Sequence, residues 1–419
     1  MTTAALTALR PARDRGQALG ITSVCSAHPQ VIGAALALGR ARGRAVLIEA
    51  TCNQVNQEGG YTGMTPADFR DFTLSIAAAE GFDPAFLVFG GDHLGPNPWR
   101  HLPADQAMER ARVMIAAYAA AGFSKLHLDC SMSCAGDPVP LPDATIAARA
   151  ADLARVAESH APLPPVYVIG TEVPVPGGAL ELVEHLAVTR PGDAAATVAL
   201  HRAEFARAGI EAAFARVIGL VVQPGVEFGN ENVVAYQPEA ARALVAALDG
   251  LPLVYEAHST DYQTTEALSA LVRDGFAILK VGPGLTFALR EALYGLDQIA
   301  TELHPGRPSL RAAMEALMLD RPEHWARYYP GTPDHQRLQR HFSYSDRIRY
   351  YWTDPRAQAA VAALMATLGD APLPEPLISQ YLGALYPAVM AGEAAPTAPA
   401  LIRAAITRML DSYDRACHP

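Results

Sequence analysis

Residues 253–303 read LVYEAHSTDYQTTEALSALVRDGFAILKVGPGLTFALREALYGLDQIATEL and contain two copies of the pattern that decides the fold. An apolar run at 253–257 precedes a helical stretch at 264–273, and a second run at 277–281 precedes a helical stretch at 286–303. Short apolar runs that alternate with amphipathic helices are typical of βαβ units around a parallel sheet.

The same pattern occurs eight times along the chain. Strands are expected at residues 21–26, 45–51, 86–90, 125–129, 166–171, 219–223, 253–257 and 277–281. Helices are expected after them at residues 29–40, 66–80, 104–121, 143–158, 194–208, 238–248, 264–273 and 286–303. Eight units predict an α/β fold of the (β/α)8 TIM barrel type. An open, doubly wound sheet is the competing arrangement, because periodicity does not reveal closure.

The chain has 419 residues, more than the roughly 250 of a bare barrel. We expect an N-terminal leader at 1–19, the barrel at 20–304 and a helical C-terminal extension at 305–419, where the strand signal stops. The extension is expected to cap the barrel, to form the interface of a homo-oligomer, or to do both.

Charge and cysteine content exclude several classes of protein. The formal charge of -10 opposes binding to nucleic acid and to anionic membranes. Apolar runs end well before the roughly 18 residues that a membrane span needs. Five cysteines and an N-terminus unlike a signal peptide predict reduced thiols and a cytoplasmic location.

Polar residues are concentrated where the predicted strands end, which is where a TIM barrel builds its active site. Carboxylates are rare in strands and costly to bury alone, so a cation is expected among them. Imidazole and carboxylate ligands suit Zn, Mn, Ni or Co. The expected ligands of this divalent metal ion are His93, Glu227, Glu256 and His258. The alternative is a set of salt bridges at the barrel mouth.

Three acids are candidates for moving protons in this site. Asp92 adjoins His93, and both side chains can face the mouth if they lie in the loop after the third strand. Asp129 and Glu172 follow the next two strands, and closely spaced carboxylates take different pKa values. The spacing does not assign acid and base among the three.

Further polar positions suit a polyhydroxylated or phosphorylated ligand. The loop from Asn53 and Gln54 to Tyr61 is rich in amides, and it is expected to close as a lid on Gly59 and Gly60. Gly282 and Gly284 precede a helix N-terminus that favours an anion such as phosphate. Arg347 and Arg349 are expected either to clamp a phosphate or to pair with a neighbouring acid such as Asp346. The remaining candidate ligand-binding residues are Gln223, Ser259 and Lys280.

Eight ordered motifs resemble one known family. They are EATCNQVNQEGGYTGMTPADF, GGDHLGPNPW, KLHLDCSM, GTEVPVPGG, VVQPGVEF, EAHSTDYQ, LKVGPGLTFALREAL and FSYSDRIRYYW. Together they are similar to the D-tagatose-1,6-bisphosphate aldolase accessory subunit family of the GatZ/KbaZ type, whose members are often labelled tagatose-6-phosphate kinases. A kinase finds no support in the residues, because the sequence has no phosphate-donor motif such as a Walker A loop.

The resemblance implies a relation to the zinc-dependent class II aldolases, in which an Asp-His pair moves a proton and binds metal. Asp92-His93 matches that pair, and His93 is the one ligand that carries over. Some members of the family epimerise ketoses at C4, and others only stabilise a class II aldolase subunit.

The resemblance and the polar mouth together predict a metal-dependent 4-epimerase that interconverts fructose-type and tagatose-type sugars or their 6-phosphates. Retro-aldol cleavage followed by aldol addition is the expected route. A non-catalytic stabilising subunit is the alternative, and a sugar-phosphate-binding protein without chemistry is a third hypothesis.

Overall fold

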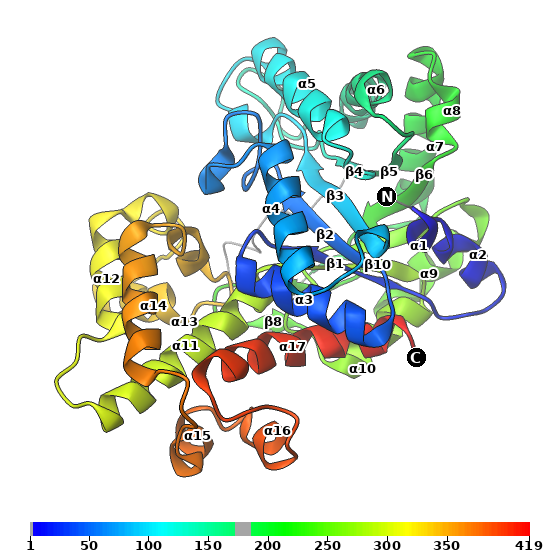
Figure 1. Ribbon diagram of the computed structural model, residues 1–419. Coiled ribbons are helices and arrows are strands. Elements are labelled where there is room, and N and C mark those ends of the chain that lie inside the picture. Colours follow the sequence, from blue (N-terminus) through cyan, green and yellow to red (C-terminus); the bar gives the residue numbers. More distant parts are fainter. Residues whose placement is uncertain (1–2, 172–185) are drawn as a thin grey trace.

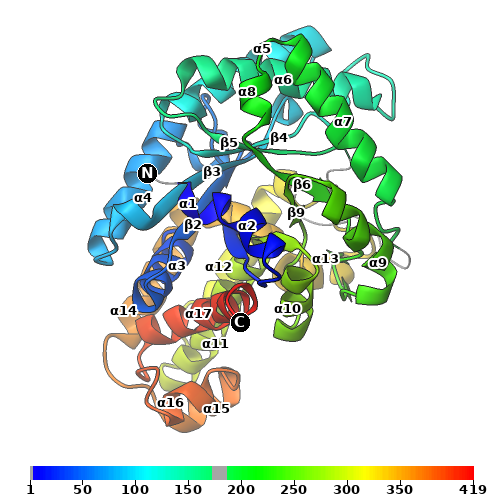
Figure 2. The same cartoon turned by 90° about the vertical axis from the view of Figure 1, so that its right-hand side faces the viewer.

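The computed structural model describes residues 3–171 and 186–419. Eight parallel strands close into a barrel in the order β1-β10-β9-β6-β5-β4-β3-β2 (Figures 1 and 2). They are β1 (Ile21–Cys25), β2 (Val46–Thr51), β3 (Leu87–Leu94), β4 (Lys125–Leu128), β5 (Val166–Ile169), β6 (Val217–Val222), β9 (Val254–Ala257) and β10 (Phe276–Val281). The closed order confirms the predicted TIM barrel and excludes the open sheet.

Strand β3 is longer than the sequence predicts. The expected strand ended at residue 90, whereas β3 pairs with β2 as far as Thr51 and Asp92 and ends at Leu94. Its pairing with β4 shifts register between Gly91 and Leu94. His93 lies in this irregularity with a φ of 49°, so the strand does not simply alternate there. The prediction that Asp92 and His93 lie in a loop after the strand was therefore wrong.

Helices on the outside of the barrel follow the strands in turn. They are α3 (Pro29–Arg42), α4 (Pro66–Ala79), α5 (Ala104–Ala120), α6 (Asp143–His160), α7 (Pro191–Arg207), α9 (Pro238–Ala247), α10 (Thr265–Arg273) and α11 (Pro283–Leu303). Several begin with a proline, whose missing N–H costs nothing in a first helical turn. Helix α11 begins three residues earlier than predicted.

The C-terminal helix α17 (Ala398–Cys417) completes the ring of helices. It contacts β1, α3 and α10, and it also lies along α11. Figure 2 shows α17 between α3 and α10, while α11 runs from the barrel toward the extension. The residue before β1 meets the end of α17 there, because Gly20 N donates a hydrogen bond to Cys417 O at 2.9 Å.

Two short N-terminal helices pack against the opposite end of the barrel from its mouth. They are α1 (Ala4–Thr7) and α2 (Leu9–Asp14). Leu6 and Leu9 are buried and belong to one apolar cluster with the interior residues Leu47, Val88 and Ile278. This end of the barrel interior is therefore filled by hydrophobic side chains.

The remaining helices form the C-terminal extension on one side of the barrel (Figure 1). They are α12 (Leu310–Asp320), α13 (Pro333–Phe342), α14 (Pro355–Leu368), α15 (Glu375–Tyr381) and α16 (Tyr386–Met390), with the 3-10 turns η5 (Pro322–His324) and η6 (Arg347–Tyr351). None of the described helices is long and apolar enough to cross a membrane. The helical pattern expected after residue 305 is confirmed.

The sequence did not predict a small hairpin between β6 and α9. Strands β7 (Glu227–Phe228) and β8 (Val233–Val234) form an antiparallel pair outside the barrel. The short helix α8 (Glu211–Phe214) before β6 was also missed.

Gly95 lets the ends of β3 and β4 approach each other. A Cβ atom at this position would lie 1.7 Å from Asp129 O. We expect Gly95→Ala to lower the free energy of unfolding by at least about 2 kcal/mol, because the backbone of one strand must move. Urea unfolding measures this change. Gly192→Ala, where the new Cβ meets nothing within 4 Å, is the matched control and should not destabilise the protein; equal effects of the two substitutions would contradict the prediction.

Candidate active site

A cavity opens at the carboxyl ends of the barrel strands. Residues from the strands, from the loops that follow them and from the extension line it. They include Cys25, Asn53, Gln54, Tyr61, Asp92, His93, His258, Ser259, Asp261, Lys280, Gly282, Arg349 and Tyr350. A pocket with convergent polar groups at this end of a TIM barrel is the expected location of an active site.

The barrel floor below this cavity holds a fully buried lysine. Lys125 Nζ lies 2.6 Å from Glu49 Oε1 and 2.8 Å from Glu256 Oε2, and none of the three side chains is exposed. Burial alone would raise the pKa of Glu256, but Lys125 and Lys280 hold it well below its usual range. Lys125 thus fixes both carboxylates in place, and the carboxylate of Glu256 is kept charged.

A second lysine links this floor to the cavity. Lys280 Nζ contacts Glu49 Oε2 and lies 2.7 Å from Asp92 Oδ1. Burial would lower its pKa, but the neighbouring Asp92, with Glu49 and Glu256, raises it well above the usual value. Lys280 is therefore a fixed ammonium group. It contacts Oδ1 of Asp92, whereas Oδ2 of Asp92 has no contact with either lysine.

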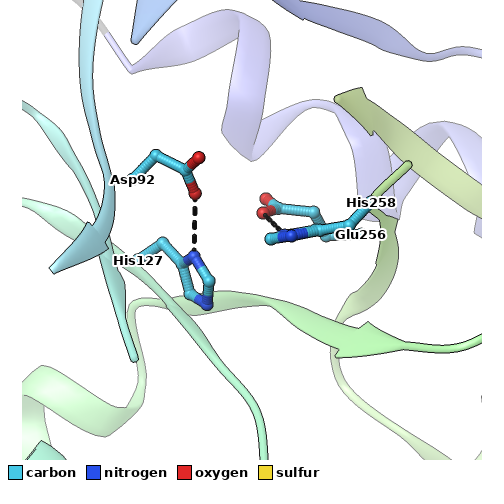
Figure 3. Close-up of side chains that lie close together, drawn as sticks. All are labelled: Asp92, His127, Glu256 and His258. Carbon is cyan, nitrogen blue, oxygen red and sulfur yellow. Dashed lines mark hydrogen bonds and ion pairs between the residues drawn. The ribbon is translucent and has the colours of Figure 1, made fainter. Parts of the chain in front are cut away.

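Four side chains, three on strands β3, β4 and β9 and one directly after β9, converge at the centre of the barrel. Asp92 and His127 face Glu256 and His258 in Figure 3. His127 Nδ1 lies 2.9 Å from Asp92 Oδ1, and His258 Nε2 lies 2.9 Å from Glu256 Oε1. One ligand atom from each of the four lies within 4.8 Å of the others. This is a possible metal-ligand cluster.

The chemistry of these residues fits a divalent cation. Burial lowers the pKa of His258 to about 4, so the imidazole is neutral at pH 7. His127 Nε2 is buried and has no hydrogen-bond partner within residues 3–171 and 186–419. A buried imidazole nitrogen with a free lone pair suits metal coordination.

His93 belongs to a neighbouring pair. Its Nδ1 lies 2.8 Å from Asp129 Oδ2, and its ring centre lies 5.2 Å from that of His127 and 5.0 Å from that of His258. Burial would lower the pKa of His93, but Asp92 and Asp129 raise it. The hydrogen bond with His93 lowers the pKa of Asp129 to about 2 against the effect of burial. His93 thus lies beside the four-residue cluster rather than within it.

Glu227, an expected ligand, lies apart from the cluster. It is on the hairpin strand β7, outside the barrel, and its Oε1 accepts a hydrogen bond from Phe228 N at 3.0 Å. Burial raises its pKa to about 7, although a hydrogen bond with Ser259 acts in the other direction.

Most of the expected ligand-binding residues line the cavity, and three do not. Gln223 Oε1 accepts from Gly225 N and Val226 N and so stabilises a turn. Arg347 turns away, with its guanidinium 3.3 Å from the ring centre of Tyr328. The third is Gly284.

The helix N-terminus expected to bind phosphate already holds a carboxylate of the chain. Asp261 Oδ1 accepts hydrogen bonds from Gly282 N at 2.9 Å and from Gly284 N at 2.8 Å. Burial raises the pKa of Asp261 to about 6. The expected anion site of α11 is therefore capped internally, which sequence spacing did not reveal.

The loop expected to be a lid is anchored at several points. Asn56 Oδ1 accepts from Glu58 N at 2.8 Å and from Gly60 N at 3.2 Å, and Thr62 Oγ1 donates to Gln54 O at 2.7 Å. Gln54 N in turn donates to Thr51 O at 2.9 Å. This loop forms a fixed wall of the cavity in the structure.

Strained backbone gathers around the mouth. Four non-glycine residues of the described chain have positive φ angles, from 45° to 66°: His93, Ser259, Tyr262 and Asp346. Such conformations cost of order 1 kcal/mol or more each and concentrate at functional sites.

Sequence reasoning gave no role to four residues of the site. They are Glu49, Lys125, His127 and Tyr350. Lys125 and His127 stand two positions apart on β4 and hence point to the same side of the strand, which alternation would have indicated. The expected catalytic residue Glu172 lies outside the described residues.

Comparison with known proteins gives consistent matches over nearly the whole chain. The family model described as D-tagatose-1,6-bisphosphate aldolase subunit GatZ/KbaZ-like matches residues 6–418. A D-tagatose 6-phosphate 4-epimerase from Agrobacterium fabrum is 57% identical over 422 residues, covering 99% of this chain and 98% of that protein. The crystal structure of a probable tagatose 6 phosphate kinase from Sinorhizobium meliloti 1021 is 59% identical, with a TM-score of 0.89, covering 95% of this chain and 100% of that chain.

The buried Glu227 predicts a pH-dependent stability difference. Its pKa in the folded chain, about 7, exceeds the unfolded value, so folding disfavours the charged form. Relative to wild type, Glu227→Gln should gain up to about 3 kcal/mol of unfolding free energy as the pH rises from 4.5 to about 7, and little more above that. Urea unfolding of both proteins at pH 4.5, 6 and 8 measures it. A difference that stays constant with pH would contradict the burial of an acid with a raised pKa.

Proposed function

The chain belongs to the D-tagatose-1,6-bisphosphate aldolase subunit GatZ/KbaZ-like family, and we propose that it is a metal-dependent 4-epimerase of a ketose 6-phosphate. The 57% identity with an epimerase over almost all of both chains makes it an enzyme of the isomerase class. The observation that carries the proposal is the cluster of Asp92, His127, Glu256 and His258 beneath a polar cavity.

Three members of the cluster are proposed to hold the metal. His258 offers a neutral imidazole, and His127 offers a ring nitrogen that has no hydrogen-bond partner among the described residues. Glu256 offers a carboxylate oxygen. Around them, the carboxylates of Glu49, Asp92, Asp129 and Glu256 outnumber the ammonium groups of Lys125 and Lys280, so the buried charges favour a bound cation. The bound metal would supply positive charge for an enediolate. Zn, Mn, Ni and Co remain the candidate metals. The coordination of the metal by His93 and Glu227 stays a prediction.

Asp92 is the proposed proton carrier of the barrel. Lys280 and His127 hold its Oδ1, while Oδ2 lies 3.7 Å from His93 Nε2. Burial opposes its charge, but His93 and Lys280 keep its pKa well below the usual range, so it is deprotonated, as a base must be before it takes a proton. Asp92 takes the proton of the C4 hydroxyl, the C3–C4 bond breaks, the aldehyde turns and the bond re-forms on its other face. Asp129 supports this by orienting His93, and an acid or base role for Asp129 and Glu172 stays a prediction.

Arg349 is the proposed phosphate contact. Its guanidinium lines the cavity, and its hydrogen bonds go to Ser345 O, Asp346 O and Tyr350 OH. No carboxylate oxygen is among these partners in the described chain, so its positive charge is available to a phosphate. Asn53, Gln54 and Ser259 line the same cavity and suit hydroxyl groups of the sugar.

A stabilising aldolase subunit is the second candidate, because the family description names an aldolase subunit. It predicts that the chain copurifies with a class II aldolase and raises its activity, with no turnover of its own. The buried charges of the mouth favour retained chemistry, since a stabilising role gives no reason to bury them. A cytoplasmic location and a homo-oligomeric state stay predictions; the five cysteines are free in the structure.

Removal of the metal tests the main proposal. The purified chain should interconvert tagatose 6-phosphate and fructose 6-phosphate, lose this activity with a chelator, and regain it with one of Zn²⁺, Mn²⁺, Ni²⁺ or Co²⁺. His127→Ala should lower metal affinity by about 10²-fold or more, measured by calorimetry, and His160→Ala on the surface of α6 should not. Absence of turnover with every metal would exclude the enzyme, and full activity after complete chelation would exclude the metal.

Arg349→Gln tests the phosphate contact. We expect the ratio of kcat/KM for tagatose 6-phosphate to kcat/KM for free tagatose to fall by about 10²-fold, because only the phosphorylated sugar meets the guanidinium. Steady-state kinetics with both sugars give the ratio, which cancels effects common to both. An unchanged ratio would place the phosphate elsewhere.

A further inference from the structure

This inference rests on the proposed function. Epimerisation at C4 by cleavage and re-formation of the C3–C4 bond requires two proton carriers. The C4 hydroxyl of one epimer points to one side of the carbon chain, and that of the other epimer points to the opposite side. Asp92, fixed to the barrel floor by Lys280 and His127, reaches one of these sides. A second group must give or take the proton on the other side.

Most other titratable groups around the cavity are already committed. Asp261 accepts two backbone N–H groups at the start of α11. Lys280 is held between Glu49 and Asp92. Burial raises the pKa of Tyr61 to about 12. Asp261 and Lys280 are held by these contacts, and the raised pKa of Tyr61 disfavours proton release near neutral pH.

Tyr350 enters the cavity from the extension. It lies on η6, and its hydroxyl accepts a hydrogen bond from Arg349 Nη2 at 2.9 Å. The guanidinium carbons of Arg349 and Arg347 lie 4.4 and 5.0 Å from its ring centre. Its ring stacks on that of His324, with 5.2 Å between the ring centres, and packs edge-on against that of Tyr61, with 4.8 Å between the centres. The phenol is therefore held rigidly, with two cations beside it.

We propose that Tyr350 is the second proton carrier of the epimerisation. In one direction, Asp92 takes the proton from O4, the C3–C4 bond breaks, and its electron pair forms the enediolate. After the aldehyde has turned, the C3–C4 bond re-forms and O4 takes the proton of the Tyr350 hydroxyl. In the other direction the phenolate of Tyr350 removes the proton and Asp92 returns one. Each turnover is redox-neutral, and the two residues regain their starting states by exchange with water.

The electrostatics of the pocket agree with this role. Burial alone would raise the pKa of Tyr350, but Arg349 and Arg347 lower it below its ordinary value. The titratable and charged groups that face it are Arg347 and Arg349 from η6, His324 from η5 and Tyr61 from η1. A more acidic phenol donates its proton more easily, and its anion also forms more easily. One direction of the reaction uses the phenol as donor, and the other uses the anion as base.

The test is Tyr350→Phe in the metal-loaded full chain. We expect kcat for epimerisation to fall by about 10²-fold or more, with KM changed by less than about threefold, because the ring stays and only the hydroxyl is lost. Tyr351→Phe is the matched control. Its hydroxyl donates to Arg321 O and is not among the cavity-lining groups, so its kcat should equal that of wild type. Thermal unfolding verifies that both variants are folded.

The pH profile separates proton transfer from positioning. In the direction in which Tyr350 donates, kcat should fall as the pH rises through its pKa, and Tyr350→3-fluorotyrosine, with a more acidic phenol, should move this limb to lower pH. A limb that does not move, or a Tyr350→Phe variant with kcat within threefold of wild type, would overturn the proposal. If the wild-type chain itself shows no epimerase activity, the proposed function fails instead.

Discussion

The position of Lys125 between Glu49 and Glu256 is the contact on which the site depends. An ammonium group in the barrel interior is costly to desolvate, and its two carboxylate partners repay that cost only in this geometry. Several groups above it are linked to this contact: Glu256 meets His258, and Glu49 meets Lys280, which holds Asp92. The orientation of the cavity floor is therefore set by a residue at the start of a strand.

The two halves of the barrel interior are stabilised by different interactions. The half near α1 and α2 is packed with aliphatic side chains, as expected for a barrel core. The half near the mouth carries charged groups that are satisfied mainly by one another. Packing supplies the stability of the first half, whereas the second half is stable only while its charges stay matched.

The sequence predicts regular features well and irregular ones poorly. Glu256 and His258 were both expected in the site because polar residues at the ends of barrel strands meet at the mouth. The bulge that turns both Asp92 and His93 inward depends on the register of β3 against β4, which no local pattern contains. Arg347 and Arg349 diverge because η6 has about three residues per turn, so positions two apart point to different sides. Likewise, the capping of α11 by Asp261 and the separation of Glu227 on a hairpin arise from tertiary contacts.

The place of α17 in the ring has a consequence for the order in which the molecule assembles. This helix begins more than a hundred residues after β10 ends, yet it covers β1 and meets the chain near Gly20. During synthesis from the N-terminus, the seam beside β1 stays bare until the whole extension has left the ribosome. The apolar face of β1 and α3 is then exposed for longest, and the long sequence separation makes this closing contact slow. Helix α17 can thus cover β1 only after the extension that precedes it has been synthesised.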